Sequence, residues 1–285
     1  MKTPFQTVSL IGVGLLGGSL GLALKERGMA TRIRGVGRRQ SSIGTALEAG
    51  VIDEGTLSIS EGVAGADLIV ICTPANNVPE TLDAIRPLCA KGAVVTDVAS
   101  TKATICAHAK KAWSSPYHFV GSHPMAGSEK FGPEHANASL YDGAVTFVET
   151  CDDHEDGVYA RVVELWESVG SRVVTIDPSE HDEMVARTSH VPHVLASILA
   201  QCVQDQESAR PFVGTGFRDT TRVAEGRPEL WRDICLTNAD AIVQGLKVVR
   251  GDLEHVIQAI ESGDADALDN FFEQGVQARR SLLDQ

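Results

Sequence analysis

Short runs of β-branched and apolar residues alternate with helical patterns along the first 177 residues. The first four runs cover residues 7–11, 32–36, 67–72 and 93–98, and glycine, proline or polar residues bound each of them, as they bound strands. The third run is continuously apolar, which is typical of a strand covered on both faces. Helical patterns at 42–49 and 78–88 lie between the runs. This alternation predicts an α/β fold with a doubly wound, mostly parallel sheet.

Three further apolar runs follow in the same part of the chain. Residues 144–148 and 172–176 resemble strands, and residues 159–169 between them have helical periodicity. The run at 117–120 leads directly into a stretch of small residues, a histidine and a proline, from Gly121 to Lys130. We expect a strand that ends in a rigid turn, with His123 held at the edge of a sheet.

The strand pattern stops at Pro178. Residues 179–206 have the periodicity of one long helix, which Pro192 could kink. Helical patterns recur at residues 229–249, 252–261 and 264–283. The chain is therefore expected to divide near Asp177–Pro178 into a first domain, residues 1–177, and an all-α second domain, residues 178–285.

The first run breaks at a glycine-rich loop of the form GxGxxG, which leads into an amphipathic helix. Gly12 permits the tight turn, Gly14 lets a pyrophosphate approach the backbone, and Gly17 lets helix and strand pack closely. Free N–H groups at the helix start, around Leu15 and Leu16, can meet the phosphate charge. The loop alone is a weak signal. Here strand, loop, helix and N-terminal position agree, and they predict a Rossmann-type dinucleotide-binding domain.

The second strand pattern ends in arginine rather than in an acid. An NAD-binding unit places Asp or Glu about 20 residues beyond the loop, on the ribose 2′-OH, whereas this chain has Arg38, Arg39 and Ser41 there. Guanidinium groups can hold a 2′-phosphate, which a carboxylate would repel. The sequence therefore favours NADP over NAD. The alternative is that both arginines are solvated at a strand end.

Polar residues follow three of the expected strands, and they are Thr73, Ser100 and His123. Ligands of such sheets bind at the carboxyl ends of the strands, so we expect these side chains to lie beside the cofactor. Histidine is suited to proton transfer near neutral pH, which makes His123 the candidate catalytic group. A histidine of this kind, taken alone, is more often packed under a loop.

The helical half carries polar residues in unusual positions. His190 and His193 share a helix face, but no Cys or carboxylate lies at a matching spacing, so we expect no metal site. The segment 214–222 is rich in glycine, hydroxyls and arginine, which suits a loop that binds a carboxylate through arginine. The alternative is a capped helix junction with its arginines in solvent.

The 285 residues carry a net charge of −13, and the pI is about 5.1. This balance argues against a broad nucleic-acid or anionic-membrane surface, so an anionic substrate must be met by a local cluster of Arg and Lys. The six cysteines form no CxxC pair, no signal-peptide pattern is present, and every apolar run is shorter than a membrane helix. A cytoplasmic protein with reduced thiols is expected.

Four further motifs follow the glycine loop in a specific order, and they are Thr96–Lys102, Gly121–Gly127, Ser189–His193 and Gly216–Arg222. These residues, in this order, closely resemble the prephenate/arogenate dehydrogenase family of tyrosine biosynthesis, over about residues 8–250. No chorismate-mutase or regulatory extension is visible, so the chain resembles the short, single-activity form.

The resemblance implies the oxidative decarboxylation of a cyclohexadienyl acid, with hydride transfer to a nicotinamide cofactor. It gives catalytic roles to His123, which accepts a hydrogen bond from the C4 hydroxyl, and to Ser100, which helps to hold both. It implies substrate contacts for Arg222, His193, Glu129 and Trp231. The expected cofactor contacts are Gly12, Gly14, Leu15, Leu16, Gly17, Arg38, Arg39, Ser41, Thr73 and Ser100. It also implies that the helical domain forms a homodimer.

Family members use prephenate, arogenate or both, and the residues leave this choice open. Glu129 could pair with the ammonium group of arogenate, whereas His193 and Arg222 could bind the keto acid prephenate. Use of prephenate, alone or together with arogenate, is slightly favoured.

One rival class, the β-hydroxyacid dehydrogenases, carries a lysine on the first long helix of the second domain, but residues 189–206 contain none. A second rival, a non-catalytic NADP-sensing module, would need no aligned catalytic residues.

Overall fold

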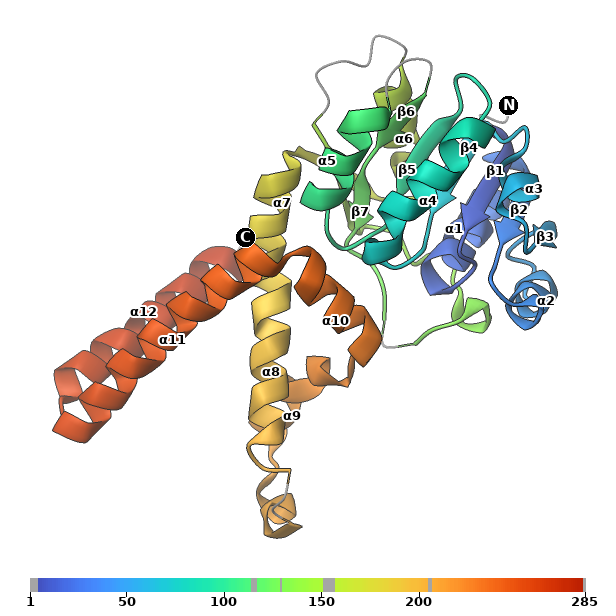
Figure 1. Cartoon of the computed structure of the whole chain (residues 1–285). Coiled ribbons are helices and arrows are strands. Elements are labelled where there is room, and N and C mark those ends of the chain that lie inside the picture. Colours follow the sequence, from blue (N-terminus) through green and yellow to red (C-terminus); the bar gives the residue numbers. More distant parts are fainter. Residues whose placement is uncertain (1–4, 114–116, 129, 151–156, 205–206, 284–285) are drawn as a thin grey trace. The chain divides into compact units, whose positions relative to one another are not determined.

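The computed structural model describes residues 5–113, 117–128, 130–150, 157–204 and 207–283. The chain forms two compact units, Met1–Ala239 and Asp240–Gln285. Figure 1 shows the strands of the first unit gathered between helices, and the two long helices of the second unit.

Six parallel strands form the main sheet of the first unit. They are β1 (Phe5–Ile11), β2 (Ala30–Val36), β3 (Glu54–Thr56), β4 (Leu68–Ile71), β5 (Val94–Asp97) and β6 (His118–Val120). Their order in space is β3-β2-β1-β4-β5-β6, so the chain switches sides between β1 and β4. This is the strand order of a dinucleotide-binding sheet, and the predicted Rossmann-type fold is confirmed.

Helices cover both faces of the main sheet (Figure 1). They are α1 (Leu15–Glu26), α2 (Gln40–Glu48), α3 (Ile59–Val63), α4 (Val78–Ile85), α5 (Ala103–Ala112) and α6 (Val158–Ser168), with 3₁₀ turns η1 (Ala75–Asn77), η2 (Arg86–Leu88) and η3 (Pro133–His135). Leu68 and Val70 of β4 join one buried cluster with residues of α1 and α6. Ile69 and Ile71 join a second cluster with residues of α4 and α5. Both faces of β4 are therefore buried, as its continuous apolar run predicted.

A second sheet of three strands contains His123. Its strands are β7 (Ser122–Pro124), β8 (Val145–Glu149) and β9 (Arg172–Ile176); β7 pairs antiparallel with β8, and β8 pairs parallel with β9. The expectation that His123 lies in a rigid turn is wrong, because it is the middle residue of a strand. Backbone hydrogen bonds from Glu149 to Gly121 and from Met125 to Val145 extend the pairing beyond β7 and keep the segment extended.

The helix predicted at residues 179–206 is interrupted, although not at Pro192. α7 (Pro178–Val185) runs into a π-helical segment, η4 (Ala186–His190), which is followed by α8 (Val191–Gln201). The carboxylate of Asp177 caps α7 by accepting the backbone N–H groups of Ser179 and Glu180. Pro192 lies in the first turn of α8, where the π segment has already disturbed the helical hydrogen bonds and a missing N–H is tolerated.

The rest of the first unit is also helical. It contains η5 (Glu207–Phe212), α9 (Thr215–Thr221), η6 (Arg222–Glu225) and α10 (Pro228–Thr237). The segment 214–222, expected as a loop, is therefore mostly the short helix α9. The helix expected at 229–249 ends early because Asn238 leaves helical geometry, and its side chain donates to the backbone oxygen of Asp182 at 2.8 Å.

The second unit consists mainly of α11 (Ala239–Ser262) and α12 (Ala265–Leu283), joined by a turn at Gly263. The break expected before residue 252 is absent, because a single glycine, Gly251, costs a long helix only about 1 kcal/mol. Many apolar side chains of this unit are exposed, and they are Val243, Val248, Leu253, Ile257, Ile260, Phe271, Phe272, Val276, Leu282 and Leu283. In the described ranges, no helix combines the length and apolarity needed to cross a membrane.

Candidate active site

The glycine loop joins β1 to α1, and its close contacts exclude side chains. Gly12 has a φ of 105°, and a Cβ there would lie 2.7 Å from the backbone oxygen of Cys72. A Cβ on Gly17 would lie 2.2 Å from the backbone oxygen of Gly12. Gly14, by contrast, is exposed, and a Cβ there would meet no atom within 4 Å. The loop is closely packed on one side and open on the other, where a phosphate group could approach the helix start.

The first turn of α1 is anchored but uncapped. Among the described side chains, none caps the helix at Gly14, so the backbone N–H groups of Leu15 and Leu16 stay available to a ligand. The buried Tyr141 donates its hydroxyl proton to the backbone oxygen of Leu16 at 2.7 Å. This bond holds the loop without using its N–H groups, which suits the binding of a dinucleotide.

Two of the predicted residues follow the strands next to this loop. Thr73 comes after β4, and its hydroxyl oxygen is buried without a hydrogen-bond partner among the described residues. A buried hydroxyl without a partner is costly, so this oxygen is well placed to bond a ligand. Ser100 comes after β5 and is half-buried, and no hydrogen bond joins it to His123 in the described part of the chain.

The arginines expected at the cofactor ribose lie in solvent. Arg38, Arg39 and Ser41 are exposed between β2 and the first turn of α2. The ion pairs of this region use the arginines within β2 instead, since Nε of Arg34 lies 2.8 Å from the carboxylate of Glu54. The guanidinium groups after β2 can therefore reach a ligand without breaking that pair.

His123 is buried in β7, and its ring contacts a second buried histidine. Nδ1 of His123 lies 2.9 Å from Nε2 of His181 in α7, with the ring centroids 5.1 Å apart. Burial lowers the pKa of His123 well below the usual 6.5, and His181, Lys102 and His190 lower this pKa further. The imidazole is therefore neutral at physiological pH and can accept a proton.

A buried ion pair lies next to this histidine and ties the two sheets together. The ammonium group of Lys102 bonds the carboxylate of Asp97 at the end of β5, and both side chains are buried. The other oxygen of Asp97 accepts the backbone N–H of Ser122 at 3.0 Å. Asp97 thus connects β5 of the main sheet to β7, which places His123 beside the carboxyl end of the main sheet.

His193 and Trp231, two residues predicted to contact substrate, stack on each other. Their ring centroids are 3.4 Å apart, and the planes are 12° from parallel. Nδ1 of His193 is buried and has no hydrogen-bond partner among the described residues, and burial lowers its pKa. His190 meets the same indole edge-on at 6.1 Å, and burial is the main cause that lowers the pKa of His190 to about 4. The structure thus forms an aromatic cluster of neutral histidines around Trp231.

Arg222 and Glu129 complete the set of predicted substrate residues. Arg222 begins η6 and is exposed, and η6 packs against α8, the helix that carries His193. Glu129 lies outside the described residues. No hydrogen bond joins Arg222 to His123 in the described ranges, so the structure brings together two pairs of residues, His123 with His181 and His193 with Trp231.

Two family models match consecutive parts of the chain. The model described as "Prephenate dehydrogenase, nucleotide-binding domain" matches residues 20–175, and the model described as "Prephenate dehydrogenase, dimerization domain" matches residues 177–274. The chain belongs to the prephenate dehydrogenase family. It is therefore an oxidoreductase, a dehydrogenase of tyrosine biosynthesis, and the resemblance seen in its motifs is confirmed.

Individual relatives of the prephenate dehydrogenase family match nearly the full chain. A prephenate dehydrogenase of Bacillus subtilis is 33% identical, over 97% of this chain and 76% of the relative. The crystal structure of prephenate dehydrogenase from A. aeolicus, in complex with hydroxyphenyl propionate and NAD+, matches with a TM-score of 0.87 at 28% identity, over 96% of this chain and 98% of that one. The structure of a Synechocystis arogenate dehydrogenase matches with a TM-score of 0.82 at 30% identity, over 98% and 100% of the two chains.

The candidate site of this family member includes two residues that sequence reasoning missed, His181, which contacts His123, and Asp182, which contacts His181. They lie on the buried face of α7 together with Pro178 and Val185. The spacing of these four positions, i, i+3, i+4 and i+7, is that of a core-facing helical stripe. A histidine and an aspartate on such a stripe were the available signal, because buried polar side chains need partners.

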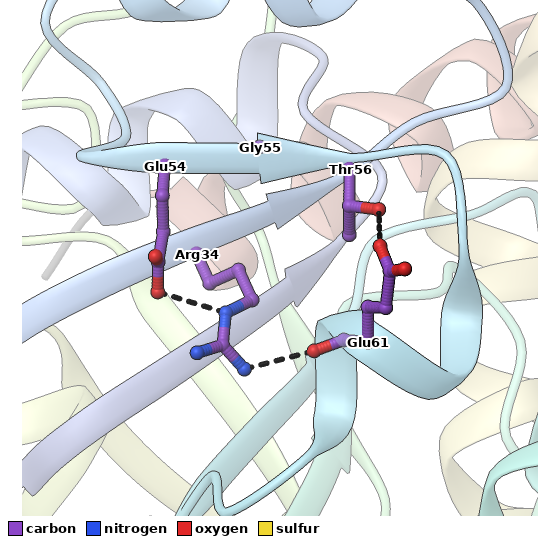
Figure 2. Close-up of a pocket in the computed structure, with 5 residues that line it drawn as sticks. All are labelled: Arg34, Glu54, Gly55, Thr56 and Glu61. Carbon is purple, nitrogen blue, oxygen red and sulfur yellow. Dashed lines mark hydrogen bonds and ion pairs between the residues drawn. The ribbon is translucent and has the colours of Figure 1, made fainter.

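Two other features of the described residues, their metal-ligating side chains and one pocket, give no second site. Within the described ranges, no group of three or more His, Cys, Asp or Glu side chains is placed to hold a metal ion. A pocket of about 280 Å³ at the edge of the main sheet is lined by Arg34, Glu54, Gly55, Thr56 and Glu61 (Figure 2). Arg34 donates to the Glu54 carboxylate at 2.8 Å and to the backbone oxygen of Glu61 at 2.9 Å. These groups are already paired, so they stabilise the edge strand β3 and offer little to a ligand.

Proposed function

We propose that the enzyme oxidises the ring carbinol of prephenate, or of both prephenate and arogenate, and uses NADP. The observation that carries the chemistry is the burial of His123 in β7, with its Nδ1 2.9 Å from Nε2 of His181. Burial lowers the pKa of this imidazole well below 6.5, which favours the neutral, proton-accepting form. When bound, the nicotinamide ring accepts the hydride that leaves C4 of the substrate. His123 accepts the proton of the C4 hydroxyl as C4 becomes a carbonyl carbon. CO2 then leaves C1, the ring becomes aromatic, and the proton returns to the ring oxygen.

The other predicted residues orient the substrate for this step. Ser100, at the end of β5, helps to hold the C4 hydroxyl beside His123. Arg222 binds a substrate carboxylate, and the unpaired Nδ1 of His193 bonds a substrate oxygen under the Trp231 ring. Glu129, which lies outside the described residues, stays a proposed substrate contact from the resemblance alone. Orientation of this kind supplies much of the rate when the reaction itself is favourable.

Steady-state assays test the substrate assignment. Prephenate and arogenate are each supplied with NADP and with NAD, and the absorbance of the reduced nicotinamide is followed. Turnover of prephenate, alone or with arogenate, is expected, with the higher kcat/KM for NADP. Turnover of arogenate alone would make the enzyme a strict arogenate dehydrogenase, and turnover of neither acid would remove the proposed reaction.

Replacement of Arg38 by alanine tests the choice of NADP. A charge-assisted hydrogen bond to the 2′-phosphate contributes about 1.5–3 kcal/mol, so kcat/KM for NADP should fall by roughly 10- to 100-fold while that for NAD changes little. Arg32→Ala, which removes another exposed arginine of the same strand region, is the matched control and should affect neither cofactor. Equal losses with both cofactors in Arg38→Ala would contradict binding of the 2′-phosphate.

Replacement of Arg222 by alanine tests the carboxylate contact. Loss of a charge-assisted bond of about 1.5–3 kcal/mol should raise KM for the acid by tenfold or more. Arg218→Ala, which removes another exposed arginine one turn earlier, should leave KM within about twofold. An unchanged KM in Arg222→Ala would show that this guanidinium does not bind the substrate.

The second unit supports a homodimer. It buries little of its own apolar surface, because Ile242 is the one buried hydrophobic residue among its described positions. Ile257 and Ile260 of α11 are 51% and 62% exposed, and Phe272 of α12 is 62% exposed. Exposed apolar side chains in such number mark a protein interface, and the matching dimerization-domain model supports a second copy of the chain as the partner.

A charge placed on this surface should weaken the dimer. Ile257→Glu buries a carboxylate in an apolar interface, and an unpaired buried charge costs several kcal/mol, so the variant should sediment as a monomer at micromolar concentration. Gln258→Glu adds the same charge at the neighbouring exposed position and should remain dimeric. A dimeric Ile257→Glu would place the interface elsewhere.

We further propose that the functional boundary lies at Asp177–Pro178, between a cofactor domain, residues 1–177, and a helical substrate-binding and dimerisation domain, residues 178–285. The meeting of the two family models between residues 175 and 177 supports this. The first compact unit extends further, to Ala239, because α7 packs on α5 and α10 packs on η1.

A cytoplasmic location is also proposed, and the buried free thiols of Cys89 and Cys106 support it.

A further inference from the structure

Three buried side chains form a continuous hydrogen-bonded chain that ends at His123. Nδ1 of His123 lies 2.9 Å from Nε2 of His181, and Nδ1 of His181 lies 2.8 Å from Oδ1 of Asp182. His123 is 8% exposed, His181 0% and Asp182 3%, so water does not compete for these bonds. The chain links β7 to α7, and the catalytic imidazole stands at its end.

The acceptor end of this chain is set by the backbone. Oδ1 of Asp182 accepts the N–H of Lys102 at 2.7 Å, and Oδ2 accepts the N–H of Ala103 at 2.9 Å, where α5 begins. Both oxygens of Asp182 therefore act as acceptors. Toward His181 the carboxylate can only accept as well, so Nδ1 of His181 carries the proton in this bond.

The direction of the remaining bond follows from the first. A neutral imidazole protonated at Nδ1 has a lone pair at Nε2. Nε2 of His181 must then accept from His123, so Nδ1 of His123 carries the proton. The lone pair of His123 is left at Nε2, and no hydrogen bond joins that atom to another side chain in the described part of the molecule. This is the tautomer that a proton acceptor needs.

We propose that His181 and Asp182 are positioning residues that hold His123 in the tautomer with a free acceptor at Nε2. This inference rests on the proposed function of His123. In the reaction, the O–H bond of the C4 hydroxyl breaks, its electron pair forms the carbonyl, and the proton moves to Nε2. The proton returns to the ring oxygen when CO2 leaves.

The other charged and titratable groups near His123 are engaged elsewhere, so the orientation of its ring depends on the hydrogen bonds through His181 to Asp182. Lys102, from the start of α5, is paired with Asp97, and His190, from the π segment, is near the amide nitrogen of Asn238 at 3.3 Å. Phe147 of β8 packs edge-on against His181, with ring centroids 5.2 Å apart. The charged and titratable groups that act on His123 are therefore His181, Lys102 and His190, and among these His181 alone hydrogen-bonds its ring.

Nitrogen NMR of the wild-type enzyme tests the tautomer without any activity measurement. The full chain is labelled with ¹⁵N-histidine, and the signals of His123 are assigned by their loss in His123→Asn. At neutral pH we expect His123 to be protonated at Nδ1 and unprotonated at Nε2. A proton at Nε2, or an equal mixture of tautomers, would overturn the proposal.

Two substitutions of His181 separate positioning from packing. His181→Phe keeps a ring of similar size beside Phe147 but removes both hydrogen bonds, so kcat should fall by about 10- to 100-fold, with KM for both ligands within about threefold. His181→Gln can accept from His123 and donate to Asp182, so kcat should recover to within about fivefold of wild type. In His181→Phe the Nδ1–H signal of His123 should weaken.

The activities of these variants distinguish failure of the positioning role from failure of the proposed function. If His181→Phe keeps a normal kcat, or if kcat and affinity fall together in both variants, the positioning role is lost. If His181→Phe does not fold, His181→Gln and the wild-type spectrum still decide. If instead His123→Asn turns over at a normal rate, the proposed function fails, whatever tautomer the spectrum shows.

Discussion

Replacement of His123 by asparagine is expected to lower kcat by about 1,000-fold. General base catalysis by a positioned side chain contributes roughly 10²- to 10⁴-fold, and an amide cannot take up the proton of the C4 hydroxyl. Asparagine fits within the space of the imidazole in β7 and keeps hydrogen-bonding groups, so KM should stay within a few-fold of wild type. Initial rates across a range of substrate concentrations measure both quantities.

A surface histidine provides the control for this substitution. His108 lies on α5, where its ring pairs with Asp83, and His108→Asn should leave kcat unchanged. A His123→Asn enzyme with more than about a tenth of the wild-type kcat would show that the histidine does not take part in proton transfer.

The pH dependence of the wild-type enzyme tests the same group. Burial, the largest cause, together with His181, Lys102 and His190, lowers the pKa of His123 well below 6.5. Only the neutral form accepts a proton, so kcat/KM should stay high as the pH falls to 6.5 and should decline only at lower pH. An acid limb centred at or above pH 6.5 would contradict a buried neutral base.

Replacement of Gly17 by alanine is expected to destabilise the cofactor domain by about 3 kcal/mol and to weaken cofactor binding by tenfold or more. The new Cβ would lie 2.2 Å from the backbone oxygen of Gly12 and 3.2 Å from the side chain of Cys72. The loop cannot retreat freely, because the N–H of Gly12 bonds the backbone oxygen of Val36 at 2.9 Å. Urea denaturation and titration with NADPH measure the two effects.

Gly14 separates packing from ligand approach. A Cβ at Gly14 meets no atom within 4 Å, so Gly14→Ala should change the free energy of unfolding by less than about 1 kcal/mol. Its cofactor affinity should nevertheless fall, because the methyl group would occupy the path of the pyrophosphate. A Gly17→Ala enzyme as stable as wild type would refute the close packing of α1 on the loop.

The main sheet could be predicted because its signals are local. The continuous apolar run at 67–72 predicts a strand buried on both faces, and the GxGxxG loop requires a strand before it and a helix after it. The position of His123 could not be found in this way. β7 has three residues and ends in a proline, and its pairing partner, β8, lies more than 20 residues further along the chain. Such a short segment reads as a turn until its partner is known.

In the candidate site, too, the sequence predicts which residues take part but not how they pack against one another. The family resemblance predicts His193 and Trp231 as site residues, but their stacking depends on α8 and α10 packing in space, which no local pattern encodes. The break of the long C-terminal pattern at Asn238 is similar, because its side chain bonds the backbone of Asp182 from a distant helix. Side chains that end an element by bonding to another element are not visible in periodicity.

The stack of Trp231 on His193 makes the candidate substrate site accessible to optical measurement. The chain has three tryptophans; Trp113 and Trp166 are 8% and 0% exposed in the cores beside the main sheet, whereas Trp231 is half-buried against an imidazole. A molecule that enters beside His193 must change the polarity around one indole and leave the other two as a constant background. Intrinsic fluorescence should therefore follow occupancy of the site in the unmodified protein, with no added dye or label.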